Sequence, residues 1–219
     1  MTHSSPDEDD MPFLVTCLID AQTKQWVDAE LWSPITEKHL ADWEAEWMPV
    51  LFSHLKALNS AGIERHHWPQ NRHWNWRDKI TSIEKSLGNP SFAIVCHGVT
   101  QAMMITDLRR RGRIESQKGD HLVYVDYLEA APWNRPGLSE SPPRYKGAGS
   151  LMIGLAIKLS IEEGFKGRIA LHSLPQANDF YANKCGMTDL GPDQHYENLR
   201  YFEMTTEQAE TYIALGAKQ

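Results

Sequence analysis

The chain has 219 residues and a hydrophobic content of 41%, which is enough for one substantial domain with a packed core. Its net charge of −7 disfavours a protein held on nucleic acid by phosphate neutralisation alone. Its 3 cysteines are widely spaced, as expected for reduced thiols in a cytoplasmic protein, and they lack metal-ligand spacing. No apolar run approaches the ~18 residues of a membrane-spanning helix.

The N-terminus lacks both the basic and the apolar region of a signal peptide. We expect residues 1–11 to form a disordered acidic tail and residues 12–219 to form a single domain. Phe13–Ile19 is predicted to be the first strand, and Trp26–Leu31 can pair back on it after a polar turn.

Thr36–Ala61 is predicted to be a long amphipathic helix. Apolar side chains recur at spacings of three and four residues and mark one face: Leu40, Trp43, Trp47, Leu51, Leu55 and Leu58. Pro49 predicts a kink or a division into shorter helices, and Gly62 suits the C-terminal cap. A short helix is expected later, over Asp78–Leu87.

The segment between these helices, His66–Arg77, has no clear period and is rich in aromatic and hydrogen-bonding side chains. Trp74 and Trp76 can form a substrate-binding wall, or they can simply pack the segment on the sheet. A zinc site built from the histidines of this segment is disfavoured, because no cysteine or acidic residue accompanies them.

Ser91–His97 and Thr100–Leu108 are predicted to form a hairpin through Gly98, followed by a basic turn at Arg109–Arg113. The remaining elements alternate between strand, loop and helix, in the order His121–Ala131, Pro132–Pro143, Ser150–Glu163, Arg168–Ser173, Gln176–Lys184 and Leu199–Met204. A strand, helix and strand in succession imply two parallel strands with a right-handed crossover. The expected fold is α/β (α+β), with a mixed sheet of about six to seven strands and about four helices.

An Arg-x-x-Gly-x-Gly turn precedes the most apolar of these helices. It comprises Arg144, Tyr145, Lys146, Gly147, Ala148 and Gly149, and Ser150 follows it. Glycines at this spacing allow a close backbone approach, and the helix that follows points free N–H groups at an anion such as a pyrophosphate. A dinucleotide loop would need a third glycine, and a nucleotide P-loop would need a Gly-Lys-Ser/Thr ending.

Three elements in sequence order resemble the GCN5-related N-acetyltransferase (GNAT) family. They are the strand end Leu128–Pro132, the pyrophosphate-type turn Arg144–Gly149 and the helix element Ala177–Met187. The resemblance covers residues 90–205. It implies an acetyl-CoA-binding core over 91–205 and a substrate-side half over 12–90.

The family resemblance implies acyl transfer, usually of an acetyl group, from coenzyme A to an amine, with no metal. It also implies a set of cofactor-binding residues: Leu128, Ala130, Arg144, Tyr145, Lys146, Gly147, Ala148, Gly149, Ser150, Asn178 and Lys184. Where the family often has an asparagine that contacts the pantetheine arm, this chain has Leu174, and Asn178 can substitute for it. Met187 replaces the usual final phenylalanine of the helix element.

Tyr181 is the candidate general acid, since by resemblance it lies near the coenzyme A sulfur. Asp126 is the candidate base, with Glu129 as the competing one. Strand alternation predicts Tyr124, Asp126 and Leu128 on one face of the strand, with Val123, Val125 and Tyr127 on the other. A carboxylate within such an apolar strand needs either a function or a structural hydrogen bond.

Trp133, Asn134 and Arg135 open a loop near the expected thioester position, where they can shape the acceptor pocket or anchor the loop. The predicted function is therefore an N-acyltransferase acting on an amine of a small molecule or a protein. The alternatives are a non-catalytic acyl-CoA-binding module and a toxin-like acetyltransferase acting on aminoacyl-tRNA. We expect a cytoplasmic protein without nucleic-acid or membrane partners, and a homodimer is compatible with the sequence.

Overall fold

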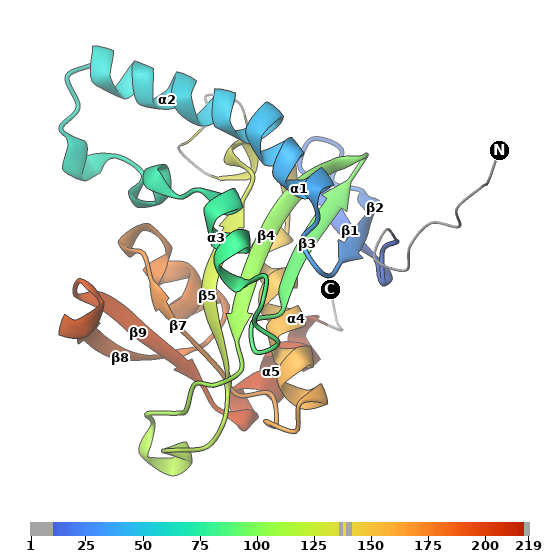
Figure 1. Ribbon diagram of the computed structural model, residues 1–219, viewed down its shortest axis with the longest axis vertical. Coiled ribbons are helices and arrows are strands. Elements are labelled where there is room, and N and C mark those ends of the chain that lie inside the picture. The colour runs from blue at the N-terminus through green and yellow to red at the C-terminus, as the bar shows by residue number, and fades with distance from the viewer. Residues whose placement is uncertain (1–10, 136–137, 139–141, 217–219) are drawn as a thin grey trace.

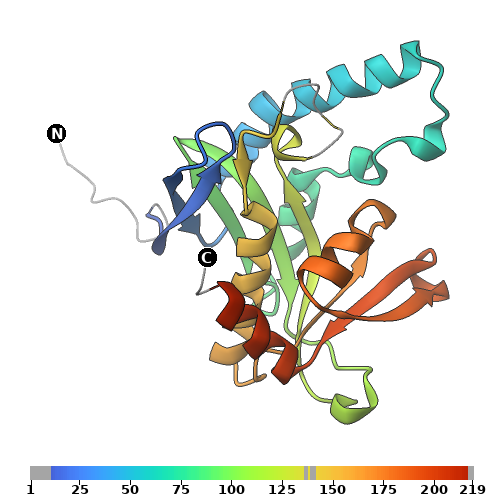
Figure 2. The same ribbon diagram turned by 180° about the vertical axis from the view of Figure 1, so that it is seen from behind.

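The computed structural model describes residues 11–135, 138 and 142–216, so most of the predicted acidic tail lies outside the described residues. Its strands form one mixed sheet in the order β6-β1-β2-β3-β4-β5-β7-β9-β8. Helices α1, α2 and α3 cover one face of the sheet, and α4 and α5 cover the other (Figure 1 and Figure 2). No helix in the described part of the chain is long and apolar enough to span a membrane.

The predicted mixed α/β fold is confirmed, but it is larger than expected. The described residues contain a 9-stranded sheet and 5 α-helices. The strands are β1 Leu14–Asp20, β2 Trp26–Trp32, β3 Ser91–Cys96, β4 Val99–Asp107, β5 Val123–Ala130, β6 Tyr145–Lys146, β7 Ile169–Ser173, β8 Thr188–Asp193 and β9 Leu199–Met204. The helices are α1 Glu37–Asp42, α2 Met48–Ser60, α3 Trp76–Ile83, α4 Ala148–Glu162 and α5 Thr206–Gly216.

Three of these elements, β6, β8 and α5, were not expected from the sequence. Strand β6 has only two residues, which is too short for any periodicity. Strand β8 contains Gly191 and Pro192, which are poor strand formers, and its ladder with β9 is irregular between Asp189 and Pro192. Pairing with β9 holds β8 in place, which is a tertiary effect that local propensity does not contain.

The long N-terminal helix is interrupted as predicted, but by a wide turn rather than by a simple kink. A π-helical turn at Trp43–Trp47 joins α1 to α2, with the N–H of Met48 donating to the carbonyl of Trp43. Pro49, which has no N–H to donate, lies in the first turn of α2, directly after the wide turn. Gly62, at φ +67°, ends the helix as expected.

Helix α3 begins two residues before the predicted Asp78. Asn75 is its N-cap, and its side-chain oxygen accepts from the N–H groups of Arg77 and Asp78 at 3.0 and 3.3 Å. Asn75 lies inside the segment that the sequence left without regular structure, and two 3₁₀ turns, Arg65–His67 and Gln70–His73, precede it. The segment therefore folds as short turns that lead into a capped helix.

The sheet separates two apolar cores. One lies between the sheet and α4 with α5, and it includes Met152, Ile153 and Phe202. The other lies beneath α1 to α3 and is built around Trp43, Trp47 and Trp76. Side chains that leave β5 on opposite faces therefore enter different surroundings.

Candidate active site

Strands β5 and β7 form the parallel pair that the sequence predicted, but they pair over only part of their length. Their register runs from Val123 opposite Ile169 to Val125 opposite Leu171. Beyond this point the two strands diverge towards the upper end of the molecule, as Figure 1 shows. In the described chain, the edge of β5 over residues 126–130 has no partner strand on this side. Its backbone groups are available to pair with an extended ligand.

A β-bulge lies at the point where the two strands diverge. On its other edge, β5 pairs with β4, and the register steps from Tyr127 opposite Ile105 to Val125 opposite Thr106, so that Asp126 is the extra residue. The bulge also resets the alternation of side chains. Leu128 packs in the α4-side core with Val123 and Val125, whereas Tyr127 packs in the α1-side core. The predicted faces of Leu128 and Tyr127 were therefore wrong.

Asp126 is half-buried at this bulge. The amide of Asn89 donates to it at 3.5 Å. Burial, reinforced by the nearby Asp107 carboxylate, raises the pKa of Asp126 to about 6, although Arg109 and Arg110 act in the opposite direction. Those two arginines are bonded directly to Asp107, with Nε to carboxylate distances of 2.7 and 3.2 Å. The pKa of Asp126 thus lies closer to neutral pH than that of an ordinary aspartate.

Glu129, the competing base, is 6% exposed and fully engaged on the opposite side of the sheet from α4. It accepts from the indole N–H of Trp76 at 2.6 Å and from the amide of Asn71, and Arg135 lies 3.3 Å away. Burial raises its pKa, while Arg135, Trp76 and Asn71 act to lower it. Trp76 is itself 0% exposed, so it has no surface to offer a substrate directly.

The glycine turn leads into α4 as predicted, and a different structural requirement favours glycine at each of its two positions. Gly147 is the N-cap at φ +97°, in the left-handed region that favours glycine. A Cβ on Gly149 would lie 3.3 Å from the ring of Phe180, so this glycine lets α4 approach that ring. The N–H of Leu151 bonds to the carbonyl of Gly147 at 2.8 Å, and within the described residues those of Ala148, Gly149 and Ser150 have no recorded acceptor.

The loop after β5 fixes the glycine turn in position. Trp133 and Asn134 both donate to the side-chain oxygen of Gln101 on β4, each at 2.9 Å. Asn134 in turn accepts from the N–H of Tyr145 at 2.9 Å, and the guanidinium of Arg144 lies 4.6 Å from the ring centre of Trp133. These contacts make Trp133 and Asn134 anchors of the loop. The sequence did not predict this role of Gln101. The one indication was that a polar residue lies within an otherwise apolar strand.

The predicted helix over Gln176–Lys184 is irregular, with a 3₁₀ turn at Pro175–Ala177 and a π turn at Phe180–Lys184. Phe180 points at Gly149, which ties this element to the first turn of α4. Tyr181 is 7% exposed, and its ring centroid lies 5.9 Å from that of Phe202. Its hydroxyl makes no recorded hydrogen bond within the described residues, although its backbone carbonyl accepts from the N–H of Met187 at 3.0 Å. Burial raises its pKa, so its hydroxyl keeps its proton.

Asn178, one turn before Tyr181, has a fully buried side-chain oxygen without a hydrogen-bond partner. Such an atom is costly unless a ligand or a water satisfies it. Lys184, also predicted to bind the cofactor, is exposed at the end of the same element.

On the other face of the sheet, Tyr127 meets side chains from the segment around α3. Trp74 packs edge-on against it, with ring centroids 5.1 Å apart. The ammonium of Lys79 on α3 lies 3.2 Å from the ring centre of Tyr127. Sequence reasoning had selected Trp74 but missed Lys79, because a lysine on a short polar helix carries no distinguishing signal.

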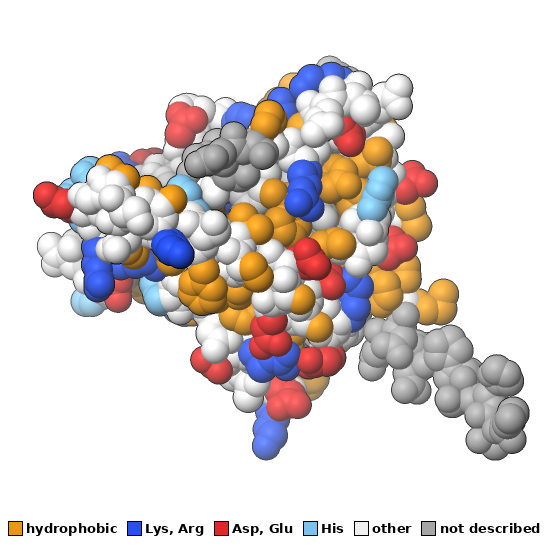
Figure 3. Space-filling model, turned by 90° about the horizontal axis from the view of Figure 1, so that it is seen from above, with side chains coloured by type: hydrophobic (Ala, Val, Ile, Leu, Met, Phe, Trp, Pro, Cys, Tyr) orange, Lys and Arg blue, Asp and Glu red, His pale blue; other side chains and the backbone are white. Residues whose placement is uncertain are grey.

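The upper end of the molecule, where α4 begins, presents a mixed surface. Figure 3 shows hydrophobic side chains across the middle of this face, interrupted by both basic and acidic side chains. Arg144, Lys146 and Ser150 are all exposed. An apolar surface with scattered positive charge suits a ligand that combines an alkyl arm with phosphates.

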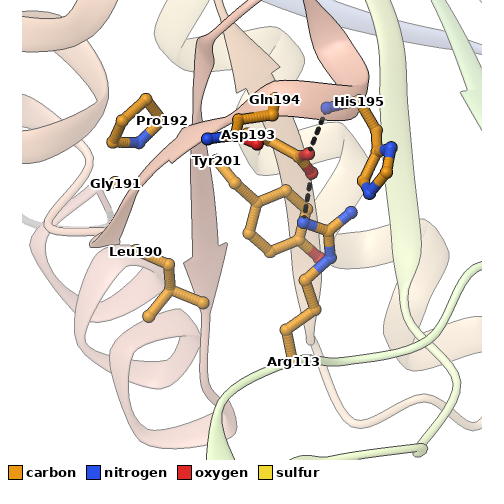
Figure 4. A pocket seen from close by; sticks show the side chains of 8 residues that line it. All are labelled: Arg113, Leu190, Gly191, Pro192, Asp193, Gln194, His195 and Tyr201. Atoms are coloured by element: carbon orange, nitrogen blue, oxygen red, sulfur yellow. Dashed lines mark hydrogen bonds and ion pairs between the residues drawn. The ribbon is translucent and has the colours of Figure 1, made fainter.

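A separate hollow of about 540 Å³ lies at the β8–β9 hairpin (Figure 4). Arg113 reaches into it and donates to Asp193 at 2.5 Å, while the backbone N–H of His195 donates to the same carboxylate at 2.9 Å. None of the predicted site residues lines this hollow. Within the described residues, no group of His, Cys, Asp and Glu is arranged to hold a metal ion.

No family model matches the chain, and no curated protein matches it by sequence. Solved structures that match include the PaiA N-acetyltransferase from Thermoplasma acidophilum in complex with coenzyme A. It is 10% identical, with a TM-score of 0.49 over 80% of this chain and 99% of that one. A GNAT-family acetyltransferase from Listeria monocytogenes is 15% identical, with a TM-score of 0.46 over 86% and 99%.

A mutant of the AtaT toxin, bound to the C-terminus of the antitoxin AtaR and to acetyl-CoA, is 10% identical, with a TM-score of 0.46 over 66% of this chain and 84% of that one. At these scores and identities, the function of this chain has to be derived from its own residues.

Proposed function

We propose that this protein is a GNAT-type acyltransferase that moves an acetyl group from coenzyme A to a primary amine. The observation that carries the proposal is the unpaired edge of β5 beside the free N-terminal turn of α4. Helix α4 packs on β5 through the core that includes Val125 and Leu128, and Gly149 in its first turn lies against Phe180, which follows β7 in the chain. An extended arm and a pyrophosphate can therefore bind side by side.

The residues present fit coenzyme A. The N–H groups of Ala148, Gly149 and Ser150 would hold the pyrophosphate, and the exposed Arg144 and Lys146 would add charge-assisted contacts. The backbone of Leu128 and Ala130 would pair with the pantetheine arm. The unpartnered oxygen of Asn178 supports the proposed substitution for the asparagine that the family often has at the position of Leu174.

Asp126 and Tyr181 would handle the protons. A thioester supplies an already activated acyl group, so the protein has to position the amine, deprotonate it and protonate the leaving thiolate. Asp126, with its raised pKa at the strand divergence, would take the proton from the amine, directly or through water. Tyr181, whose raised pKa keeps it protonated, would donate to the thiolate.

Of the remaining predicted residues, some would position the site or hold its loop, and one would contact the acceptor. We assign Glu129 to positioning, because Trp76, Asn71 and Arg135 already occupy its carboxylate. Trp133, Asn134 and Arg135 would hold the loop that supports the glycine turn. Trp74 is half-buried, and it is the predicted acceptor-side residue that packs on Tyr127.

The test begins with thermal unfolding in the presence and absence of acetyl-CoA, followed by a thiol-release assay with a panel of primary amines. Stabilisation with thiol release supports the transferase. Stabilisation without release from any amine favours an acyl-CoA-binding module, and no stabilisation contradicts both functions. Co-purified tRNA that becomes acetylated would instead favour the toxin-like alternative.

A further inference from the structure

Lys79 stands apart from the other lysines in its surroundings. Its ammonium lies 3.2 Å from the ring centre of Tyr127 and 4.9 Å from that of Trp74, and it makes no recorded ion pair or hydrogen bond within the described residues. By contrast, Lys38 and Lys118 are bonded to carboxylates. A half-buried amine held by two aromatic rings is oriented by them but is not committed to a counter-ion.

The environment of Lys79 favours a reactive amine. Burial lowers its pKa to about 8, and this effect outweighs the opposite influence of Glu129 and Asp126 on β5 and of Asp78 on its own helix. Roughly a quarter of the side chains would be neutral at pH 7.5, compared with about one in a thousand for an ordinary lysine. The neutral form is the nucleophile.

The location of Lys79 matches that of an acyl acceptor. Tyr127, the ring beneath the ammonium, directly precedes Leu128 on the unpaired edge of β5 and directly follows Asp126. The side chain of Tyr127 leaves the strand on the face opposite the α4-side core. Lys79 therefore lies beside both the proposed base and the strand edge proposed to hold the acyl donor.

We propose that Lys79 is an internal acceptor, so that the protein acetylates its own α3 helix when acetyl-CoA is bound and no external amine competes. This inference rests on the proposed function. The amine nitrogen of Lys79 forms an amide bond with the acyl carbon, and the carbon–sulfur bond breaks. The amine proton passes to Asp126, and the thiolate leaves and is protonated to coenzyme A thiol.

Acetylation of Lys79 would change the acceptor side of the site. It replaces an ammonium with a neutral amide above Tyr127 and removes a positive charge that lowers the pKa of Asp126. The modified protein would carry a more basic Asp126 and an apolar group in the space beside Trp74. Self-acetylation would thereby alter the preference for external amines.

The experiment incubates the full chain with acetyl-CoA and follows acetylation by intact mass and peptide mapping. Lys85, exposed in the segment that follows α3, is the internal reference, and Lys79→Arg and Lys85→Arg are the matched variants. We expect modification at Lys79 at least about tenfold faster than at Lys85, because the amine is already positioned. Its first-order rate should be independent of protein concentration. The acetylation should be lost in Lys79→Arg and kept in Lys85→Arg.

Acetic anhydride labelling without coenzyme A gives a second measurement that does not depend on donor binding. We expect Lys79 to label with a midpoint near pH 8. Thiol release to external amines with no acetyl group on Lys79, or with equal rates at Lys79 and Lys85, overturns this inference and leaves the proposed function standing. Absence of acetyl-CoA binding overturns both.

Discussion

The replacement Asp126→Asn separates a functional carboxylate from a structural one, because the two roles predict opposite changes in stability. In the folded protein the pKa of Asp126 is raised from 3.8 to about 6, so above pH 6 the folded state holds a carboxylate that the unfolded state accommodates more easily. The difference between these pKa values corresponds to an upper limit of about 3 kcal/mol.

Asp126 keeps part of its surface exposed, so we expect Asp126→Asn to stabilise the protein at pH 7.5 by a smaller amount, about 1–2 kcal/mol. The replacement amide can still accept the hydrogen bond from Asn89. The gain should shrink as the pH falls from about 6 towards 4, because Asp126 becomes neutral below pH 6 in the folded state and near pH 4 in the unfolded state as well.

The assay is urea unfolding at pH 7.5, 6 and 4.5, with Asp28→Asn as the control, since Asp28 is exposed and makes no recorded side-chain bond among the described residues. In parallel, Asp126→Asn should lower the rate of thiol release by about 10²- to 10⁴-fold. The pH profile of that rate should also lose the decline that the parent protein shows below about pH 6. An Asp126→Asn protein that is less stable than the parent at pH 7.5, or a gain independent of pH, would refute the reasoning.

Three further replacements test the rest of the site. Gly147→Ala strains a residue at φ +97° by about 1–2 kcal/mol and should weaken acetyl-CoA binding in calorimetry. Gly62→Ala, which also places an alanine at a positive φ (+67°) but at the end of α2, should lower stability without changing acetyl-CoA binding. Tyr181→Phe should lower turnover and leave acetyl-CoA affinity intact; unchanged turnover would remove its assigned role. Glu129→Ala should destabilise the protein by about 3–5 kcal/mol in urea unfolding, because it leaves Arg135 buried without its counter-ion. A loss below about 1 kcal/mol would contradict the buried pair.

The sequence predicted those features that depend on neighbouring residues. The strand and helix periods of residues 91–173 indicated the hairpin and the parallel crossover, and both are present. The glycine spacing before α4 indicated an N-terminal turn open to an anion, and Gly147 adopts the left-handed conformation that such a turn requires. The strands, the helix and its glycine N-cap were predictable because turns, caps and amphipathic faces are determined within a few residues of the chain.

Tertiary structure decided what each side chain of the site faces. The bulge at Asp126 arises from the pairing of β5 with β4, and it moved Leu128 and Tyr127 to faces that simple alternation did not predict. The enclosure of Glu129 depends on Asn71 and Trp76, which lie 58 and 53 residues before it along the chain. Only long-range packing creates such contacts.

The same distinction explains Asp126 and Lys79. From the sequence alone, Asp126 is a carboxylate in an apolar strand and Lys79 is a lysine on a short helix, and such residues can have many roles. Burial beside Asp107 gives Asp126 its raised pKa, and the rings of Trp74 and Tyr127 hold the amine of Lys79. The sequence by itself therefore predicted where an acyl donor would bind, while the surroundings of Asp126 and Lys79 came from desolvation and register, which exist only in the folded chain.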